Sequence, residues 1–107
     1  MALTVELEAL PGPRREDLRL EAVLQALGDP VRLLIVRTLL SEAGGRRACG
    51  SFSLPVAKST ASHHFRVLRE AGVIRQCASG RERLTELRRD DLEGRFPGLL
   101  QSIAGAN

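Results

Sequence analysis

Four polar side chains in one stretch carry the most informative chemistry in this sequence. If Val56–Ile74 forms a helix with 100° per residue, all four fall on the same side of it. They are Ser59, Ser62, His63 and Arg66. Short polar and cationic groups of this kind donate hydrogen bonds to phosphate oxygens and to base edges. The stretch therefore indicates a helix whose outer face meets a nucleic acid.

The other side of the same helix is apolar. It carries Ala61, Phe65 and Leu68, with Thr60, His64 and Val67 flanking them. Gly72 ends the helix at a point where a left-handed residue is tolerated, and Val73 begins a β-branched run. We expect His64 to be a partly buried packing residue, hydrogen-bonded at one ring nitrogen, and His63 to face the partner.

Two further helices are predicted upstream to support this one. Arg14–Leu27 has apolar residues at the i, i+3, i+4, i+7 spacing of a helix: Leu20, Val23, Leu24 and Leu27. After Gly28, Asp29 is placed to cap a second helix and Pro30 to occupy its first position. The buried stripe of the second helix would comprise Val31, Leu34, Ile35, Thr38 and Leu39, widened by Leu33, Val36 and Leu40. This helix is the expected centre of the core.

The remaining segments give weaker signals. Leu3–Ala9 alternates apolar and polar residues, which favours a short strand or an extended arm that either pairs with a second subunit or stays mobile. Ser41–Gly50 is expected to be a flexible basic connection that contains Gly44-Gly45. Near the C-terminus, Asp90–Leu92 could begin a helix that breaks at Phe96–Gly98, before a final amphipathic turn.

A β-hairpin is predicted directly after the polar helix. Val73–Ala78 and Arg83–Leu87 have the composition of strands, and Ser79–Glu82 between them is a glycine-bearing turn. Arg81 and Arg83 lie at or beside the tip, where they can reach a phosphate backbone or an adjacent minor groove.

The composition fits one domain with a polyanionic partner. The chain has 107 residues, and its aromatic residues are three Phe, which argues against a pocket of stacked rings. Lys58–Arg89 contains eight basic and three acidic residues, a local charge of +5; since the whole chain carries +3, the remainder carries −2. An ordinary arginine-rich solvated surface is the competing interpretation of this charge.

Targeting signals and cysteines set the expected compartment. Met1–Leu10 lacks the basic start and apolar run of a signal peptide, and no stretch approaches the ~20 apolar residues of a membrane span. Two cysteines, Cys49 and Cys77, are too few for a disulfide scaffold. We therefore expect a cytoplasmic, nucleoid-associated protein without a membrane partner.

Two motifs resemble the ArsR/SmtB family of bacterial winged helix-turn-helix regulators. They are Lys58–Ile74, similar to the recognition helix of that family, and Leu27–Val36 upstream. The resemblance implies a mainly α fold with a small β-hairpin wing, in which residues 1–13 form an N-terminal arm or strand and residues 14–107 the DNA-binding and dimerisation domain. It also implies a sequence-specific repressor that binds a near-palindromic operator in double-stranded DNA as a homodimer, through the N-terminal helix and the C-terminal segment.

The resemblance and the helix geometry together give a set of candidate DNA contacts. For the major groove they are Lys58, Ser59, Thr60, Ser62, His63 and Arg66; for the backbone, from the wing, they are Arg81 and Arg83. Family architecture would place the first helix of the helix-turn-helix at Ala48–Leu54, but Gly50, two serines and Pro55 predict only a short or irregular turn.

The usual effector ligands of the family are absent. Members sense metals through two neighbouring cysteines near the start of the helix-turn-helix, or through ligands on the last helix; here Cys49 stands alone and the final segment has no histidine. No cofactor is required, and a metal effector held by other ligands stays open. Cys49 and Cys77 are also candidates for a thiol switch if their Cα atoms lie within about 7 Å.

The sequence offers few features of other functional classes. No phosphate loop, nucleophile elbow or oriented catalytic base occurs, so we expect no enzyme. The rival interpretation is a winged-helix module that binds a protein or RNA without operator specificity. A small effector or a regulatory partner protein could control either kind of module.

Overall fold

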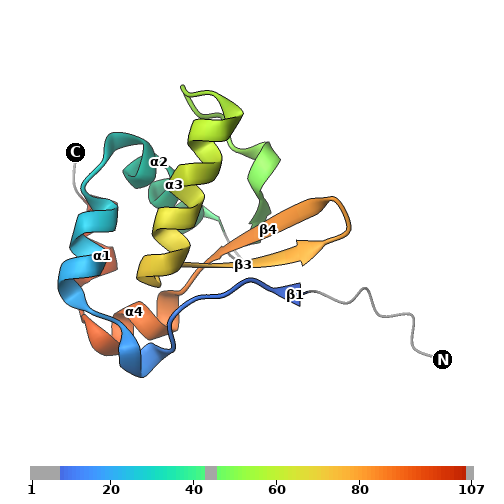
Figure 1. Cartoon of the computed structure of the whole chain (residues 1–107). Helices are drawn as coiled ribbons and strands as arrows, with labels where there is room; N and C mark the ends of the chain where they lie inside the picture. The colour runs from blue at the N-terminus through green and yellow to red at the C-terminus, as the bar shows by residue number, and fades with distance from the viewer. Residues whose placement is uncertain (1–7, 43–45, 106–107) are drawn as a thin grey trace.

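The computed structural model describes residues 8–42 and 46–105. In chain order the elements are β1 (Glu8–Ala9), a 3-10 turn η1 (Arg15–Asp17), α1 (Leu20–Leu27), α2 (Pro30–Ser41), β2 (Arg46–Ala48), a second 3-10 turn η2 (Cys49–Ser51), α3 (Lys58–Ala71), β3 (Ile74–Ser79), β4 (Glu82–Leu87), α4 (Arg89–Arg95) and α5 (Leu99–Gly105). Figure 1 shows the helices gathered on one side, with α3 crossing in front of a hairpin that extends away from them.

The strands form one small antiparallel sheet in the order β1-β3-β4-β2. The β3–β4 hairpin is its centre, with Ile74 opposite Leu87 at the base and Ser79 opposite Glu82 beside the tip. Gly80 in the turn has φ 60°, a left-handed value that glycine adopts without strain. The predicted mainly α fold with a β-hairpin wing is confirmed.

The second helix lies at the centre of the core, as predicted. Asp29 caps it: the side-chain Oδ2 accepts the backbone N–H groups of Val31 at 2.9 Å and Arg32 at 3.1 Å. Ile35, Val36 and Leu39 are fully buried. The predicted stripe was wrong at Leu34, which is 40% exposed, because the sheet and the other helices leave that side of α2 uncovered.

The predicted single helix over Arg14–Leu27 was also wrong. The chain makes one 3-10 turn, then extends through Leu18 and Arg19 before α1 begins at Leu20. The extension places Leu18 in the core, against Gly72 at the end of α3; a Cβ on Gly72 would lie 2.1 Å from Leu18 Cδ2. Of the four residues of the predicted apolar stripe, Val23 and Leu27 are buried, whereas Leu20 and Leu24 are 46% and 50% exposed; Ala26 is buried beside Val23 and Leu27.

Both edges of the sheet differ from expectation. The described end of the predicted N-terminal strand pairs with β3 of its own chain, Glu8 opposite Ala78, rather than with a second subunit; residues 3–7 of that prediction lie outside the described residues. Within the predicted flexible connection, Arg46–Ala48 forms β2 on β4, while Gly44-Gly45 lie outside the described residues. Neither pairing has a local signature, because each depends on a strand far away in the sequence.

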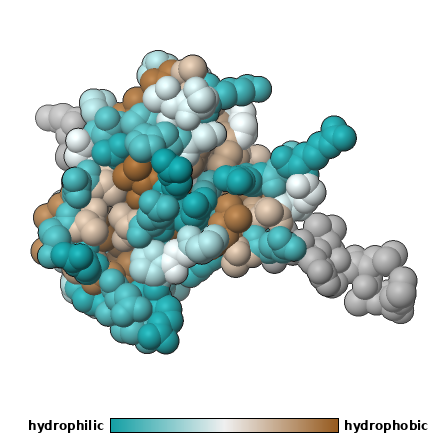
Figure 2. Space-filling view, viewed as in Figure 1, coloured by the Kyte–Doolittle hydropathy of each residue, from teal (hydrophilic) through white to brown (hydrophobic). Residues whose placement is uncertain are grey.

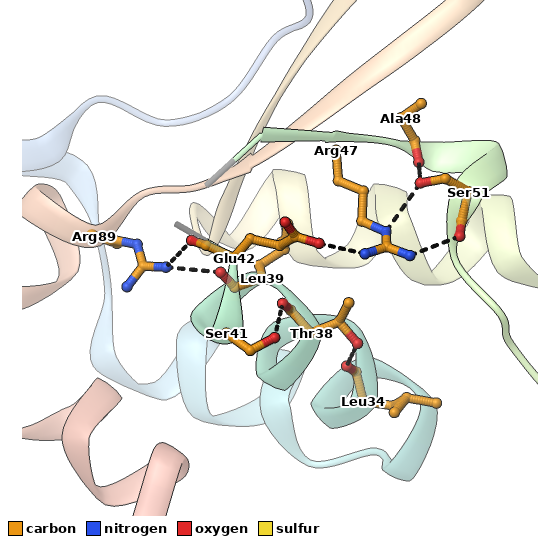
Figure 3. A network of polar contacts seen from close by, with 9 residues as sticks. All are labelled: Leu34, Thr38, Leu39, Ser41, Glu42, Arg47, Ala48, Ser51 and Arg89. Carbon is orange, nitrogen blue, oxygen red and sulfur yellow. Dashed lines mark hydrogen bonds and ion pairs between the residues drawn. The ribbon is translucent and has the colours of Figure 1, made fainter. Parts of the chain in front are cut away.

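A polar network fixes the junction between α2, β2 and η2. Arg47 forms an ion pair with Glu42 and donates through Nη2 to the carbonyl of Ser51 at 3.0 Å. From the other side, Arg89 Nη2 donates to the carbonyls of Leu39 and Glu42 at the end of α2 (Figure 3). These bonds hold the short turn η2 where a helix-turn-helix has its first helix, and the predicted irregular turn is thereby confirmed.

Across the described parts of the chain, every helix is too short or too polar to span a bilayer.

Candidate nucleic-acid interface

Helix α3 has an exposed first turn, Lys58–Thr60, and beyond it separates a buried from an exposed face. His64, Phe65 and Leu68 are buried, and Phe65 meets Phe52 edge-on, with ring centroids 5.2 Å apart. Gly72 ends the helix with φ 88°, and its N–H bonds back to Arg69. The six predicted groove contacts on this helix and both wing arginines are exposed.

The structure gathers five of these eight residues around one depression of about 380 Å³. Its lining comprises Ser59, Ser62, His63, Arg66, Arg69 and Arg83. Arg83 reaches it from β4, because Arg83, Thr85 and Leu87 alternate onto the face of the hairpin that α3 covers. Helix and wing therefore form one continuous concave surface. Figure 2 shows hydrophilic residues over this region and at the tip of the hairpin.

Three predicted contacts lie outside the depression. Lys58 and Thr60 are on the first turn of α3, and Arg81 is in the turn of the hairpin. The side chains of Lys58, Arg81 and Arg83 make no hydrogen bond or ion pair with any residue that the structure describes. Their charges are available to a partner.

Arg66 and His63 form a donor pair on the exposed face. Arg66 Nη2 lies 3.3 Å from His63 Nδ1. Because a guanidinium only donates, His63 Nδ1 accepts and the ring proton is on Nε2. Both side chains thus present donors outward, which suits the acceptor-rich edge of guanine or a phosphate.

His64 connects α3 to α2, as a packing residue should. Its Nδ1 lies 3.1 Å from Arg32 Nη1 and 3.8 Å from Asp29 Oδ2. Because a guanidinium only donates, Arg32 is the donor to His64 Nδ1 in the shorter contact. The backbone N–H of Arg32 holds the pKa of the Asp29 carboxyl below its usual value. The predicted hydrogen bond at one ring nitrogen of His64 is confirmed.

Several other arginines of the basic segment serve the fold instead. Arg69 donates to the carbonyl of Pro11 and to Gln76, and so binds the N-terminal arm to α3. Arg88 is buried and donates to Asp91 and to the carbonyl of Pro13. Together with Arg75 and Arg89 these side chains are already partnered. No local sequence pattern separates these arginines from the exposed cations.

The two cysteines are free and do not face each other. Cys49 Sγ lies 2.9 Å from Thr85 Oγ1 and accepts from Gln76 Nε2 at 3.0 Å, on the side of the sheet that α3 covers. Cys77 follows Gln76 on β3, so its side chain points to the opposite side. An intramolecular disulfide cannot form in this arrangement, which corrects the hypothesis of a direct Cys49–Cys77 bond.

The residues present do not fit a metal site of the family type. Cys49 has a hydroxyl and an amide as neighbours, and residues 8–42 and 46–105 contain no group of three or more His, Cys, Asp or Glu side chains that could hold an ion. The Cys49–Gln76–Thr85 cluster was missed at the level of sequence. Its signal was a polar Gln76 at an inward position of an otherwise apolar strand pattern.

The fold and this surface define a winged helix-turn-helix, a class in which the recognition helix enters a DNA groove. A model described as "Bacterial regulatory protein, arsR family" matches residues 29–76, from the cap of α2 into β3. The uncharacterized HTH-type transcriptional regulator YceK of Bacillus subtilis (strain 168) is 36% identical over 83 residues, 76% of this chain and 82% of that protein. The uncharacterized HTH-type transcriptional regulator MJ1325 of Methanocaldococcus jannaschii is 36% identical over 59 residues, 54% of this chain and 65% of that protein.

The chain therefore belongs to the arsR family of bacterial regulatory proteins. It is a DNA-binding transcriptional regulator and not an enzyme, in agreement with the prediction from sequence.

Proposed function

We propose that this protein is a repressor that binds a near-palindromic operator as a homodimer. The observation that carries the proposal is the concave surface shared by α3 and the wing, where Arg66, His63 and Arg83 converge with their donors free for DNA. In this arrangement α3 enters the major groove, and Arg81 and Arg83 hold the phosphate backbone alongside it.

The exposed apolar side chains support the dimer. Leu20 and Leu24 are one helical turn apart on α1 and about half exposed, although each is a large aliphatic residue. Burying them against α1 and α5 of a second copy would remove this surface from water. In Figure 2, apolar residues appear along the edge where Figure 1 places α1. A two-fold dimer would present its recognition helices ~34–36 Å apart, one turn of B-DNA.

Selection of bound sites from a random DNA pool tests the operator. We expect enrichment of an inverted repeat whose half-sites are about one helical turn apart, bound ~10³-fold or more tightly than random DNA. Recovery without any sequence preference, together with binding to a protein or to RNA, would favour the rival interaction module. Repeating the selection with metals, oxidants and reductants tests whether a metal or thiol signal releases the DNA.

Sedimentation of full-length variants tests the dimer surface. Leu24→Asp places a charge on the proposed interface and should yield monomers at concentrations where the parent is dimeric. Leu34→Asp is the matched control, because Leu34 is also an exposed leucine, 40% against 50% for Leu24, and lies on α2 outside the proposed interface. Dimers that survive Leu24→Asp but not Leu34→Asp would place the interface elsewhere.

As a DNA-bound repressor, the protein would act in the cytoplasm on the nucleoid. Its release would then depend on an effector or on a regulatory partner protein that changes the affinity of the dimer for DNA.

A further inference from the structure

A second cavity lies directly beside the DNA-facing depression. It has a volume of about 330 Å³, at the lower end of the ~300–1,000 Å³ range of small-molecule pockets. Phe52, Leu54, Val56, Ala61 and Phe65 give it apolar walls. It opens between η2, the first half of α3 and the wing.

The reduced first helix of the helix-turn-helix accounts for this cavity. After the single turn Cys49–Ser51, residues 52–57 have no regular structure, so no helical row of side chains fills the space beneath α3. The walls are nevertheless fixed. The guanidinium of Arg47, held by Glu42 and Ser51, lies 5.2 Å from the centre of the Phe52 ring, and that ring packs on Phe65.

The floor of the cavity is polar but saturated. Cys49 and Gln76 line it and hydrogen-bond to each other and to Thr85 behind them, and Gln76 Oε1 accepts from Arg69. The floor therefore offers little to a polar ligand group. The unpaired charges in the lining are those of Lys58 and Arg83, and none of the lining residues, all of which the structure describes, is acidic.

We propose that this cavity binds a small carboxylic acid with an apolar ring or branched body, and that this binding lowers the affinity of the protein for DNA. The body would pack against Phe52, Leu54 and Phe65, and the carboxylate would pair with Lys58 and Arg83. A neutral apolar molecule would leave those cations without a partner, so the charge complementarity selects an acid.

The link to DNA follows from shared residues and rests on the proposed function. Ser62 and Arg83 line both the cavity and the DNA-facing depression, and Lys58 is a predicted groove contact. A carboxylate that neutralises Lys58 and Arg83 removes two of the charges available for phosphates. Ligand and DNA therefore compete for the same side chains.

The probe for the test is 2-naphthoate, with the neutral 2-naphthamide as its control. Titration of isotope-labelled full-length protein with the acid should give saturable changes in the NMR chemical shifts of Leu54, Ala61 and Phe65. The amide should bind with an affinity about tenfold lower, because it has no charge to pair with the cations. Saturating naphthoate should weaken binding to the selected operator by ~5–150-fold, a usual range for coupled sites.

Matched variants test whether the effect of naphthoate on operator affinity arises from this cavity. Leu54→Glu adds a negative charge to the cavity, whereas Ser53→Glu adds the same charge at the exposed neighbouring position. If Leu54→Glu fails to fold, Gly50→Leu replaces it, because a Cβ at Gly50 meets no atom within 4 Å and the added side chain narrows the opening. Either cavity variant should lose the response to naphthoate. Gly50→Leu should bind the operator like the parent, whereas Leu54→Glu, which places its own carboxylate beside Lys58 and Arg83, should bind the operator more weakly than Ser53→Glu even without naphthoate.

Three results would overturn the proposal: no naphthoate shifts at millimolar concentration, shifts centred away from the cavity, or cavity binding that leaves operator affinity unchanged. Failure of the proposed function looks different. In that case the protein without naphthoate would select no operator, whatever the NMR titration shows.

Discussion

The basic side chains of Lys58–Arg89 form two groups with different roles. At the surface of α3 and the wing, Lys58, Arg81 and Arg83 point to solvent without a partner among the described residues. At the base of the wing, Arg88 and Arg89 donate hydrogen bonds to backbone carbonyls and to a carboxylate, and these bonds hold the helices together. A cation contributes to DNA binding only if the fold has left it unsatisfied, so net charge overstates the size of a DNA-binding surface.

The largest expected effect comes from the base of the wing. Arg88→Ala removes a buried guanidinium that bonds to Asp91 at 2.9 Å and to the Pro13 carbonyl, leaving both acceptors short of a donor. We expect the free energy of unfolding to fall by ~2–4 kcal/mol, measured by urea denaturation. Arg81→Ala, the control from the exposed group, should change it by less than ~0.5 kcal/mol. Equal losses of unfolding free energy for Arg88→Ala and Arg81→Ala would contradict the distinction between the structural and the exposed arginines.

Arg66→Ala tests the exposed face of α3 at the position where it should read the DNA sequence. Removing a donor from a base edge should cost ~1–3 kcal/mol on the operator and relax specificity at one base pair, while binding to random DNA changes little. Fluorescence anisotropy with both DNAs measures this. Glu70→Gln, an exposed change on the same helix but outside the depression, should leave the operator preference intact. A loss that is uniform across sequences would reassign Arg66 to the phosphate backbone.

Asp29→Ala tests a structural contact that involves no arginine side chain, the cap of α2. Loss of the α2 cap should lower the free energy of unfolding by ~1 kcal/mol at neutral pH. Since folding lowers the pKa of Asp29 from its ordinary 3.8, the carboxylate stabilises the fold above pH 3.8, and this is lost as the pH falls through the folded value. The gap between parent and variant should therefore narrow below pH 3.8. Asp17→Ala, in an exposed pair with Arg14, should show no comparable gap.

The smallest effect belongs to the tip of the wing. Arg81→Ala should weaken binding to all DNA sequences alike and reduce the slope of log affinity against log salt by ~0.9, one phosphate contact. Binding measured from 50 to 200 mM salt with operator and random DNA provides the comparison. Arg81→Lys keeps the charge and should keep the slope. An operator-specific loss for Arg81→Ala would show that the wing tip reads bases.

The features predicted correctly from sequence are those with local causes. Asp29 and Pro30 fix the start of α2, Gly72 fixes the end of α3, and the 3.6-residue period assigns the two faces of α3. The poor helix propensity of Gly50 and Pro55 predicts the irregular turn that leaves the cavity beneath α3. Each of these signals lies within a few residues of the structure that it specifies.

The features that were missed depend on distant partners. Periodicity identified Leu20, Val23, Leu24 and Leu27 as one apolar side of α1, but Leu20 and Leu24 are exposed. Leu18, packed against Gly72, turns the helix so that Ala26 is covered together with Val23 and Leu27. The strand Arg46–Ala48 exists because β4 offers an open edge. A helical repeat shows that one side is apolar; what that side meets is decided by the rest of the chain.

By itself, the sequence determined helix α3 with its polar face, the hairpin beside it and the family to which they belong, because caps, turns and helical periods are encoded by neighbouring residues. Only the tertiary structure decided which cations remain free, where the two thiols point, and that Arg83 joins α3 in one surface. Those properties depend on which polar groups satisfy one another across the fold, and such pairings link residues tens of positions apart.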